Sequence, residues 1–287
     1  MMKKVLIFGG DSFTGYHLKH HLQAQGYEVF TTSYDSCDLT QKEQIENCLI
    51  QFCADYIINL AAISSPAHKD ILSFYRVNTI GTANLLESIL KLELTPKKVI
   101  LASSAAVYGN QNRSVLDESL CPQPANHYGA SKLSMEHIAR GYFSKLPILI
   151  LRPFNYTGVG QSQDFLIPKI VSHFKNKQEV IQLGNLNVIR EFNDVAFTCE
   201  AYKRLLESNI ASDIFNIASN RGIKLLEVIE MMNNIAHYKI KIAVNPSFVR
   251  KDEILHLTGS NQKLFEAVGP IEQKSFTQTL LDIYLHH

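Results

Sequence analysis

Over its first half the chain alternates between short apolar runs and longer stretches in which apolar residues recur every three or four positions. The apolar runs have the length of buried strands and cover residues 5–8, 28–32, 56–60, 98–102 and 148–151. The stretches with helical spacing cover residues 13–25, 41–51, 71–92 and 128–139. Strands and helices that alternate in this way predict an α/β protein with a doubly wound parallel sheet.

After residue 155 the apolar runs become shorter and the pattern less regular. The predicted strands of this half cover residues 180–181, 189–192, 214–217 and 240–244. Its predicted helices cover residues 170–174, 194–207, 225–236 and 276–285. This mixture predicts a smaller, mixed α/β lobe in the second half of the chain.

Composition and charge narrow the class of protein only slightly. Of the 287 residues 46% are hydrophobic and 19% charged, as in ordinary globular proteins. The net charge is +1 and no basic or acidic block interrupts the chain. We therefore expect neither nucleic acid nor an anionic membrane surface as a partner.

The cysteines and the absence of a long apolar run bear on the compartment. The chain has five cysteines and no Cys-x-x-Cys pair, a pattern that favours reduced thiols and argues against a metal site. No run approaches the roughly 20 apolar residues of a membrane span, and the apolar start at residues 5–8 is too short for a signal peptide. The sequence predicts a cytoplasmic protein.

A glycine-containing turn joins the first predicted strand to the first predicted helix. Gly9, Ser12 and Gly15 are spaced three residues apart, with Phe13 and Thr14 between the last two. A turn of this kind lets the backbone and a helix N-terminus approach a pyrophosphate, so these five residues are predicted to bind a dinucleotide. The alternative is a plain strand-to-helix turn.

The end of the second predicted strand bears on the choice of dinucleotide. The run Thr32-Ser33-Tyr34 has neither a carboxylate for a ribose 2′-hydroxyl nor an arginine for a 2′-phosphate. Because the missing carboxylate removes a repulsion, the interpretation leans to NADPH over NADH. Asp38 either caps the following helix or contacts the adenine amine.

Small residues follow the third predicted strand. Leu60, Ala61 and Ala62 leave room for the flat backbone of a cofactor. Together with Ser33, Asp38 and Leu39 they complete the predicted cofactor-binding set.

A tyrosine and a lysine four residues apart provide the candidate chemistry. Tyr128 and Lys132 would lie on one face of a helix, where an ammonium favours the phenolate and lowers the pKa of the tyrosine. Such a tyrosine exchanges a proton with a carbonyl oxygen while hydride reaches the carbon. Ser104, at the end of the fourth strand, could hydrogen-bond to the same oxygen. A chance Tyr-x-x-x-Lys pair is the alternative.

Asn78 lies inside the long helix predicted at residues 71–92. Asparagine is a mediocre helix former, so it either faces solvent, bends the helix or frees a carbonyl that holds a water behind Lys132.

Taken together, these motifs resemble the extended short-chain dehydrogenase/reductase family, which includes NAD-dependent epimerases and dehydratases. The resemblance covers nearly the whole chain and rests on residues 9–15, 59–62, 78, 103–109, 128–132 and 152–153. It implies a Rossmann-type sheet, with Tyr128 as catalytic acid/base, Lys132 as its partner and ribose ligand, Ser104 as the carbonyl-orienting hydroxyl and Asn78 as a relay residue.

The resemblance also implies a division into two domains. Residues 1–155 plus about 191–218 would bind the dinucleotide. Residues from about 156 to 190 plus 219–287 would form the lobe that binds a nucleotide sugar.

Within that family, the 4,6-dehydratases carry an Asp-Glu pair where this chain has Ala105-Ala106. A methyl group cannot move a proton, so the dehydratase reaction is excluded, whereas epimerases remain open. The runs at residues 152–161, 184–195 and 257–261 are most similar to GDP-6-deoxy-4-keto-mannose reductases, which make GDP-D-rhamnose and related sugars for bacterial surface polysaccharide.

The similarity implies a substrate set for a GDP-sugar. Lys169, Arg190 and Arg250 match positions that hold the diphosphate in that group, and arginine suits the task through its bidentate fork. Glu253 is placed at the nucleotide end, where residues 250–253 depart from the group's Arg-Pro pair. Asn155 follows the fifth strand, at the edge where ligands of such sheets bind.

The expected activity is NADPH- or NADH-dependent reduction of the C4 keto group of a GDP-4-keto-6-deoxy sugar, a hexose or its heptose analogue. The alternatives are a nucleotide-sugar 4-epimerase with tightly bound NAD and, in another class, a non-catalytic NADP-binding sensor. Related enzymes form homodimers through a four-helix interface. Apolar residues on the two helices at 71–92 and 128–139 permit one here, although core packing explains them equally well.

Overall fold

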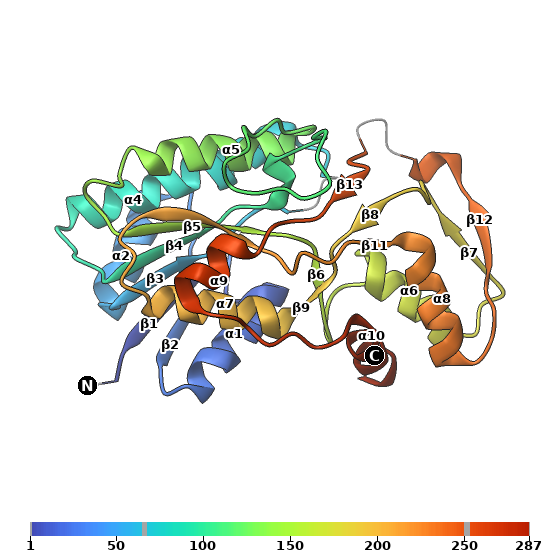
Figure 1. Ribbon diagram of the computed structural model, residues 1–287. Helices are drawn as coiled ribbons and strands as arrows, with labels where there is room; N and C mark the ends of the chain where they lie inside the picture. The colour runs from blue at the N-terminus through green and yellow to red at the C-terminus, as the bar shows by residue number, and fades with distance from the viewer. Residues whose placement is uncertain (1, 65–67, 250–252, 287) are drawn as a thin grey trace.

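A six-stranded parallel sheet forms the centre of the molecule in this computed structural model, which describes residues 2–64, 68–249 and 253–286 (Figure 1). The strand order is β10-β5-β4-β3-β1-β2. The strands are β1 Lys4–Phe8, β2 Glu28–Thr32, β3 Tyr56–Asn59, β4 Lys98–Ala102, β5 Ile148–Pro153 and β10 Asp213–Ile217. The predicted α/β sheet is confirmed, and all five strands expected in the first half are present.

Helices cover both faces of this sheet because successive strand residues point to opposite sides. Along β1, Val5 and Ile7 belong to one core and Leu6 and Phe8 to the other. The first core is covered by helices α1 Phe13–Ala24, α7 Val195–Glu207 and α9 Gln262–Val268. The second is covered by α2 Lys42–Phe52, α4 Thr82–Lys91 and α5 His127–Arg140.

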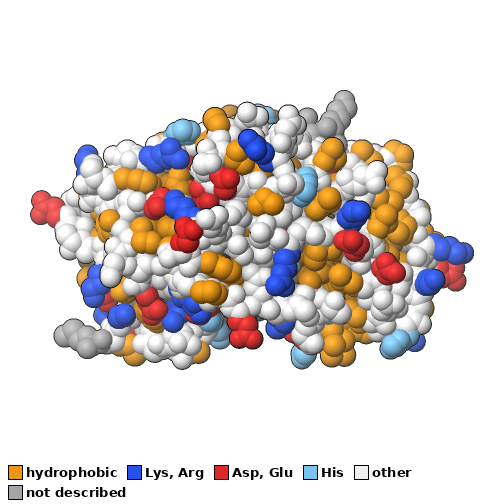
Figure 2. Space-filling view, in the orientation of Figure 1, with side chains coloured by type: hydrophobic (Ala, Val, Ile, Leu, Met, Phe, Trp, Pro, Cys, Tyr) orange, Lys and Arg blue, Asp and Glu red, His pale blue; other side chains and the backbone are white. Residues whose placement is uncertain are grey.

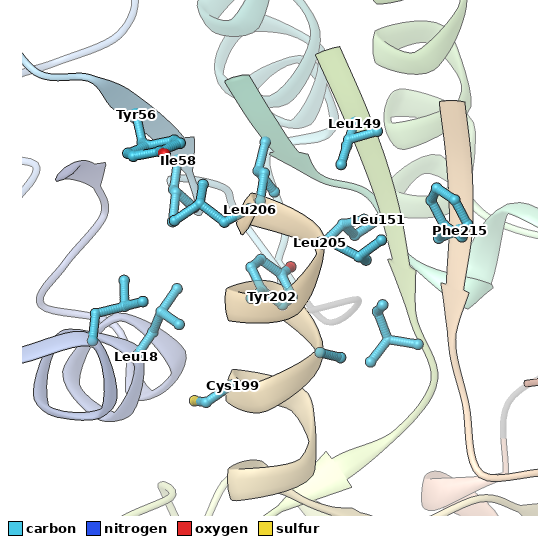
Figure 3. Packing of buried hydrophobic residues seen from close by; sticks show 14 of the residues in the cluster. Leu18, Tyr56, Ile58, Leu149, Leu151, Cys199, Tyr202, Leu205, Leu206 and Phe215 are labelled. Atoms are coloured by element: carbon cyan, nitrogen blue, oxygen red, sulfur yellow. The ribbon is translucent and has the colours of Figure 1, made fainter. Parts of the chain in front are cut away.

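Figure 3 shows how the first core is filled. Leu205 and Leu206 from α7 point toward the sheet, where Leu205 lies beside Leu151 of β5, whereas Cys199 points toward α1. Leu18 of α1 packs from the side. Helices α1 and α7 thus pack closely against one face of the sheet, and this packing supports the carboxyl edge that carries the candidate site.

A smaller lobe, defined as the elements around a third core, lies at the other end of the molecule (Figure 1). It consists of α6 Leu166–Lys175, α8 Leu225–Ala236, α10 Phe276–His286 and the parallel pair β7 Val180–Leu183 and β12 Lys241–Val244. Figure 2 shows hydrophobic side chains gathered over this lobe, in the region of α8 and α10, where Leu226 and Leu285 are exposed. The division of labour between the lobes stays a prediction.

Short elements connect the sheet to the smaller lobe. They are β6 Tyr156–Thr157, β8 Ile189–Arg190, β9 Asn193–Asp194, β11 Ile223–Lys224, β13 His256–Leu257 and the turn η3 Pro246–Phe248. Strand β8 pairs with both β11 and β13, and β6 pairs with β9. Most of these two-residue strands were not predicted, because a run so short carries no periodicity.

The long helix expected at residues 71–92 is interrupted. The structure has a first turn α3 Ile71–Phe74, a π-helix η1 Tyr75–Gly81 and then α4. One extra residue per turn in η1 shifts the register of the helix, and Asn78 lies inside that segment. Asn78 thus lies where the helical hydrogen-bond pattern changes, and its roles in bending the helix or in freeing a carbonyl stay predictions.

Three features of the described residues bear on the class of protein. None of their helices is long and apolar enough to cross a bilayer. They contain no cluster of three His, Cys, Asp or Glu side chains fit to hold a metal ion. All five cysteines are free thiols.

Candidate functional site

The carboxyl ends of β1, β3 and β4 meet at one edge of the sheet, where the strand order reverses between β1 and β3. Open parallel sheets bind their ligands at such an edge. The residues predicted to bind a cofactor and to act on a carbonyl follow these strands, so the fold brings them to the same edge.

The turn between β1 and α1 is built for close approach. Ser12 is the N-cap of α1; its Oγ accepts a hydrogen bond from Gly15 N at 3.0 Å and donates one to Gly9 O at 2.7 Å. Gly9 has φ +77°, and a Cβ there would lie 2.7 Å from Ala61 N. A Cβ on Gly15 would lie 2.5 Å from Gly9 O. Only glycine fits either position, and the free N-terminus of α1 is suited to a pyrophosphate.

The same turn is tied to the chain beyond β5. The hydroxyls of Thr14 and Tyr156 share a hydrogen bond of 2.5 Å, and the rings of Phe13 and Tyr156 stack with centroids 6.3 Å apart. Tyr156 leads into the segment that enters the smaller lobe. No pattern in the sequence indicates this contact, because the partners are separated by 142 positions.

The run Thr32-Ser33-Tyr34 at the end of β2 carries hydroxyl groups and no charge, and Asp35 follows it. Ser33 Oγ bonds to Ser36 Oγ at 3.3 Å, and the buried Thr32 Oγ1 has no hydrogen-bond partner within the described part of the chain. Asp38 accepts from Thr40 N at 2.8 Å, whereas the N-cap of α2 is Gln41. The expectation that Asp38 caps this helix is therefore wrong; its carboxylate caps the turn before it.

The segment after β3 lies against the glycine turn. Leu60 N donates to Phe8 O at 2.9 Å, and Ala61 N donates to the Asn59 side chain at 3.1 Å. Ala61 and Ala62 are partly exposed at the sheet edge. Their small side chains leave the floor of the edge open, as the cofactor prediction requires.

Helix α5 presents Tyr128 and Lys132 on successive turns, opposite Ser104. Asn126 caps α5 by accepting from Gly129 N at 2.9 Å. A Cβ on Gly129 would lie 2.5 Å from Ala106 O, so the helix packs directly on the 3-10 turn η2 Ala105–Val107 that follows Ser104. Tyr128 is half-buried and Lys132 fully buried.

The electrostatics of this pair differ from the expectation. Burial raises the pKa of Tyr128 above its ordinary value, and a hydrogen bond with the Ser104 side chain opposes the rise. Burial also lowers the pKa of Lys132 to about 8, with the Glu136 carboxylate acting in the opposite direction. Lys132 Nζ is directed to Ala102 O at 2.7 Å. The pKa of Tyr128 is therefore raised by burial, whereas the spacing of Tyr128 and Lys132 predicted that it would be lowered.

Asn78 is buried and fully bonded, so its solvent-facing interpretation is wrong. Its side chain accepts from Ile63 N at 2.9 Å and donates to Ile63 O at 3.1 Å and to Ser131 Oγ at 3.0 Å. Its backbone carbonyl accepts from Thr82 Oγ1 at 2.9 Å. Asn78 thus joins the segment after β3 to the helix that carries Lys132.

The predicted substrate residues occupy two regions. Arg190 Nη2 donates to Glu253 Oε1 at 2.9 Å, so the structure brings these two together. Lys169 Nζ lies 4.4 Å from the ring centroid of Phe248. Asn155 is exposed just after β5, with its carbonyl accepting from Asn193 N. Arg250 lies outside the described residues.

A hollow of about 290 Å³ borders Lys169 and is also lined by Asp164 and His173. Neither Tyr128 nor Ser104 lines this hollow. It could receive part of a ligand held by Lys169, but it is not the place of the carbonyl chemistry.

The sequence did not indicate the buried polar groups behind the site. Glu136 and Arg152 form an ion pair at 2.6 Å with about 1% of each side chain exposed. Glu191, also fully buried, accepts from Ser219 N and Arg221 N, and burial raises its pKa to about 7. The spacing of Lys132 and Glu136, four residues apart, is the one signal that could have indicated the first of these.

The sequence of the chain matches one protein family and several characterised enzymes. The model of the NAD dependent epimerase/dehydratase family matches residues 5–218. GDP-6-deoxy-D-talose 4-dehydrogenase of Aggregatibacter actinomycetemcomitans is 37% identical over 93% of this chain and 91% of its own. GDP-6-deoxy-D-mannose reductase of Pseudomonas aeruginosa is 28% identical over 98% of this chain and 95% of its own.

A solved structure agrees with these matches. The structure of RMD from Pseudomonas aeruginosa complexed with NADPH superposes with a TM-score of 0.89 and is 27% identical. The match covers 100% of this chain and 97% of that one.

Proposed function

The chain belongs to the NAD dependent epimerase/dehydratase family, and from that membership we propose that it reduces the C4 keto group of a GDP-4-keto-6-deoxy sugar. The coarser conclusion, a nucleotide-sugar enzyme with a nicotinamide cofactor, follows from the family and its relatives. The observation that carries the finer proposal is the placement of Tyr128 and Lys132 on successive turns of α5, with Ser104 in hydrogen-bond contact with Tyr128.

In this proposal each side chain has one task. The dinucleotide supplies a hydride equivalent when bound. Tyr128, which is protonated at neutral pH, donates its phenolic proton to the C4 oxygen. Ser104 hydrogen-bonds to the same oxygen, Lys132 stabilises the phenolate that remains, and Asn78 holds the turn behind Lys132.

The residues of the sheet edge fit a dinucleotide. The glycine turn approaches so closely that a Cβ at Gly9 or Gly15 would collide with backbone, and Ser12 leaves the first turn of α1 open. Phe13, Thr14, Leu60, Ala61 and Ala62 surround this turn, and Ser33, Asp38 and Leu39 follow β2. We propose NADPH as the preferred cofactor because the run Thr32-Ser33-Tyr34 at the end of β2 offers hydroxyls and no carboxylate.

The sugar nucleotide would lie between the sheet edge and the smaller lobe. We propose the division in which residues 1–155 plus about 191–218 hold the dinucleotide, and about 156–190 plus 219–287 hold the nucleotide sugar. Asn155 would contact the sugar, Lys169 and Arg190 the diphosphate, and Glu253 the nucleoside. Arg250 belongs to the proposed set by sequence alone.

The two GDP-sugar relatives support a GDP carrier, and their names differ in the sugar. 6-Deoxy-D-mannose and 6-deoxy-D-talose are C4 epimers, so the product depends on which face of the keto sugar receives hydride. We propose GDP-4-keto-6-deoxy-mannose as the substrate, with a heptose analogue as the second candidate. A product such as GDP-D-rhamnose would serve bacterial surface-polysaccharide synthesis.

The decisive test is consumption of NADPH, followed by absorbance, on addition of GDP-4-keto-6-deoxy-mannose. The proposal expects one NADPH oxidised per keto sugar consumed, and proton NMR of the product assigns its C4 configuration. Conversion of a sugar without added NADPH, by protein that purifies with bound NAD, would instead identify the 4-epimerase. Binding of NADPH without turnover of any sugar would indicate the non-catalytic sensor.

We also propose that the protein is a homodimer through the face formed by α3 and η1. Ile71, Leu72 and Ile80 are exposed there by 46%, 67% and 50%. Light scattering should give twice the chain mass for the native protein and the single mass for Leu72→Glu. The matched control is Leu285→Glu, a leucine 63% exposed on α10, which should leave the mass doubled.

A further inference from the structure

Two polar ties fix α5 against the end of β4. Lys132 Nζ donates to Ala102 O at 2.7 Å, and Ser103 Oγ donates to Glu136 Oε1 at 2.5 Å. Lys132 and Glu136 are four residues apart and lie on one face of α5. Their partners are consecutive residues of the chain. The helix can therefore neither slide nor rotate against this strand without breaking both ties.

The Glu136 carboxylate is clamped from the neighbouring strand. Arg152 of β5 donates from Nε to Oε1 at 2.9 Å and from Nη2 to Oε2 at 2.6 Å. This bidentate fork leaves the carboxylate one orientation. The third arm of Arg152, Nη1, donates to the Tyr108 hydroxyl at 2.9 Å, and that hydroxyl donates to Asn216 Oδ1 at 2.8 Å. The clamp therefore spans β5, the segment after η2, and β10.

We propose that Glu136 is a positioning residue for the proposed reaction: clamped by Arg152 and Ser103, it sets the place of Lys132 along α5 and supplies the negative charge that faces it. The inference rests on the proposed function of Lys132. It concerns a buried carboxylate that is bonded to Ser103, directly after β4, and is placed in neither the proposed cofactor set nor the proposed substrate set.

The charges around Lys132 make this role measurable. On α5 itself Glu136 and Tyr128 face it, and β5 contributes Arg152 through the ion pair. Tyr108 follows η2, and Arg76 and Tyr75 lie on η1, which also packs against α5. Burial lowers the pKa of Lys132 to about 8 and Glu136 opposes that fall. Without the carboxylate, the buried guanidinium of Arg152 would lack its ion-pair partner, and Lys132 would lose the charge that opposes the fall of its pKa.

The experiment titrates Lys132 directly, without substrate. In protein labelled with ¹³C at lysine Cε, the Lys132 resonance is identified by its loss in Lys132→Met, and its pKa is read from the shift against pH. Glu136→Gln should lower that pKa by about one unit or more, because a neighbouring opposite charge is lost. An unchanged titration of Lys132 in a folded Glu136→Gln protein would overturn the proposal.

A second variant, expected to shift the pKa of Lys132 in the opposite direction, keeps the proposal testable if the first variant folds poorly. Arg152→Met removes the balancing cation and keeps the carboxylate, so the pKa of Lys132 should rise above its native value. Loss of structure alone would shift the pKa of Lys132 in the same direction in both variants. A fall of the Lys132 pKa in folded Arg152→Met protein would overturn the proposal even if Glu136→Gln cannot be purified.

A third variant separates charge from packing. Ser103→Ala removes one tie to Glu136 and leaves both charges, so the Lys132 titration should stay within a few tenths of a unit of the native protein. A shift as large as that of Glu136→Gln would assign the effect to packing and refute the charge role. Because none of these readings needs turnover, absence of ketoreductase activity would remove the proposed function and leave the titration result standing.

Discussion

At the scale of single residues, one phenol determines the reaction we propose. Tyr128 has a raised pKa, is bonded to Ser104 and is followed one turn later by Lys132. A protonated phenol at neutral pH suits an acid that reduces a ketone. These three residues could be predicted from sequence, because their spacing reflects a helix turn and a strand end. The sign of the Tyr128 pKa shift could not, since it depends on burial.

Replacing Tyr128 by Phe should lower kcat for NADPH-dependent reduction by about 10²- to 10⁴-fold, the range for loss of a general acid. The Kd for NADPH, measured by fluorescence titration, should change little because the phenyl ring remains. Tyr75→Phe is the matched control, since the Tyr75 hydroxyl forms its hydrogen bond among the described residues with exposed His127. Equal kcat for Tyr128→Phe and the native protein would exclude the proposed role.

Glu191 provides a residue-scale test of the buried groups that sequence did not indicate. Its raised pKa of about 7, against 4.5, means that the folded chain binds the extra proton between these values. The contribution of this proton to the stability of the folded protein is therefore complete below about pH 4.5 and is lost as pH rises to about 7. Its full size is about 3 kcal/mol at 1.36 kcal/mol per pKa unit.

Urea unfolding at pH 5 and pH 8 checks this expectation. Glu191→Gln carries no titrating carboxyl, so its free energy of unfolding should fall less between the two pH values than that of the native protein. A matched control is Glu93→Gln, an exposed carboxyl in a positive-φ turn. Parallel pH profiles for native protein and Glu191→Gln would contradict the account.

At the scale of elements, the junction of β1 and α1 leaves no room for a side chain at Gly9 or Gly15. The turn could be predicted because glycines at fixed spacing between a strand and a helix have few other uses. The π-helix η1 could not, since the apolar pattern of residues 71–92 fits an uninterrupted helix equally well. The two-residue strands around β8 depend on partners far along the chain.

Gly15→Ala should weaken NADPH binding by about 10- to 100-fold, because a methyl group there displaces backbone at a cost of about 1–3 kcal/mol. Gly141→Ala is the control: its φ is −62° and its Cβ would meet only Ile138 O, at 3.2 Å. Isothermal titration with NADPH measures both. Native affinity in Gly15→Ala would show that the glycine turn does not hold the dinucleotide.

At the scale of the whole molecule, we propose that the smaller lobe and the segments that join it to the sheet bind the sugar nucleotide. The Arg190–Glu253 pair could not be predicted as a pair, although both residues were expected at the nucleotide end. Residues 63 positions apart give no pattern that reveals contact. The pairing also means that a diphosphate must share Arg190 with Glu253.

Arg190→Met should weaken binding of GDP by about 10- to 100-fold, the loss expected when a charge-assisted hydrogen bond of about 1.5–3 kcal/mol is removed. NADPH binding should stay at the native level, because the two ligands belong to different lobes. Arg113→Met, at an exposed site, is the control. Equal loss of NADPH and GDP binding would contradict the proposed division of labour.

Transfer of deuterium tests the central claim most directly. The protein is incubated with GDP-4-keto-6-deoxy-mannose and NADPH deuterated at the transferring position of the nicotinamide, and the sugar is examined by mass spectrometry and NMR. The account predicts one deuterium, bound at C4 of the product, for each NADPH oxidised. Recovery of the keto sugar unchanged, or oxidation of NADPH with no deuterium at C4 of the sugar, would contradict it.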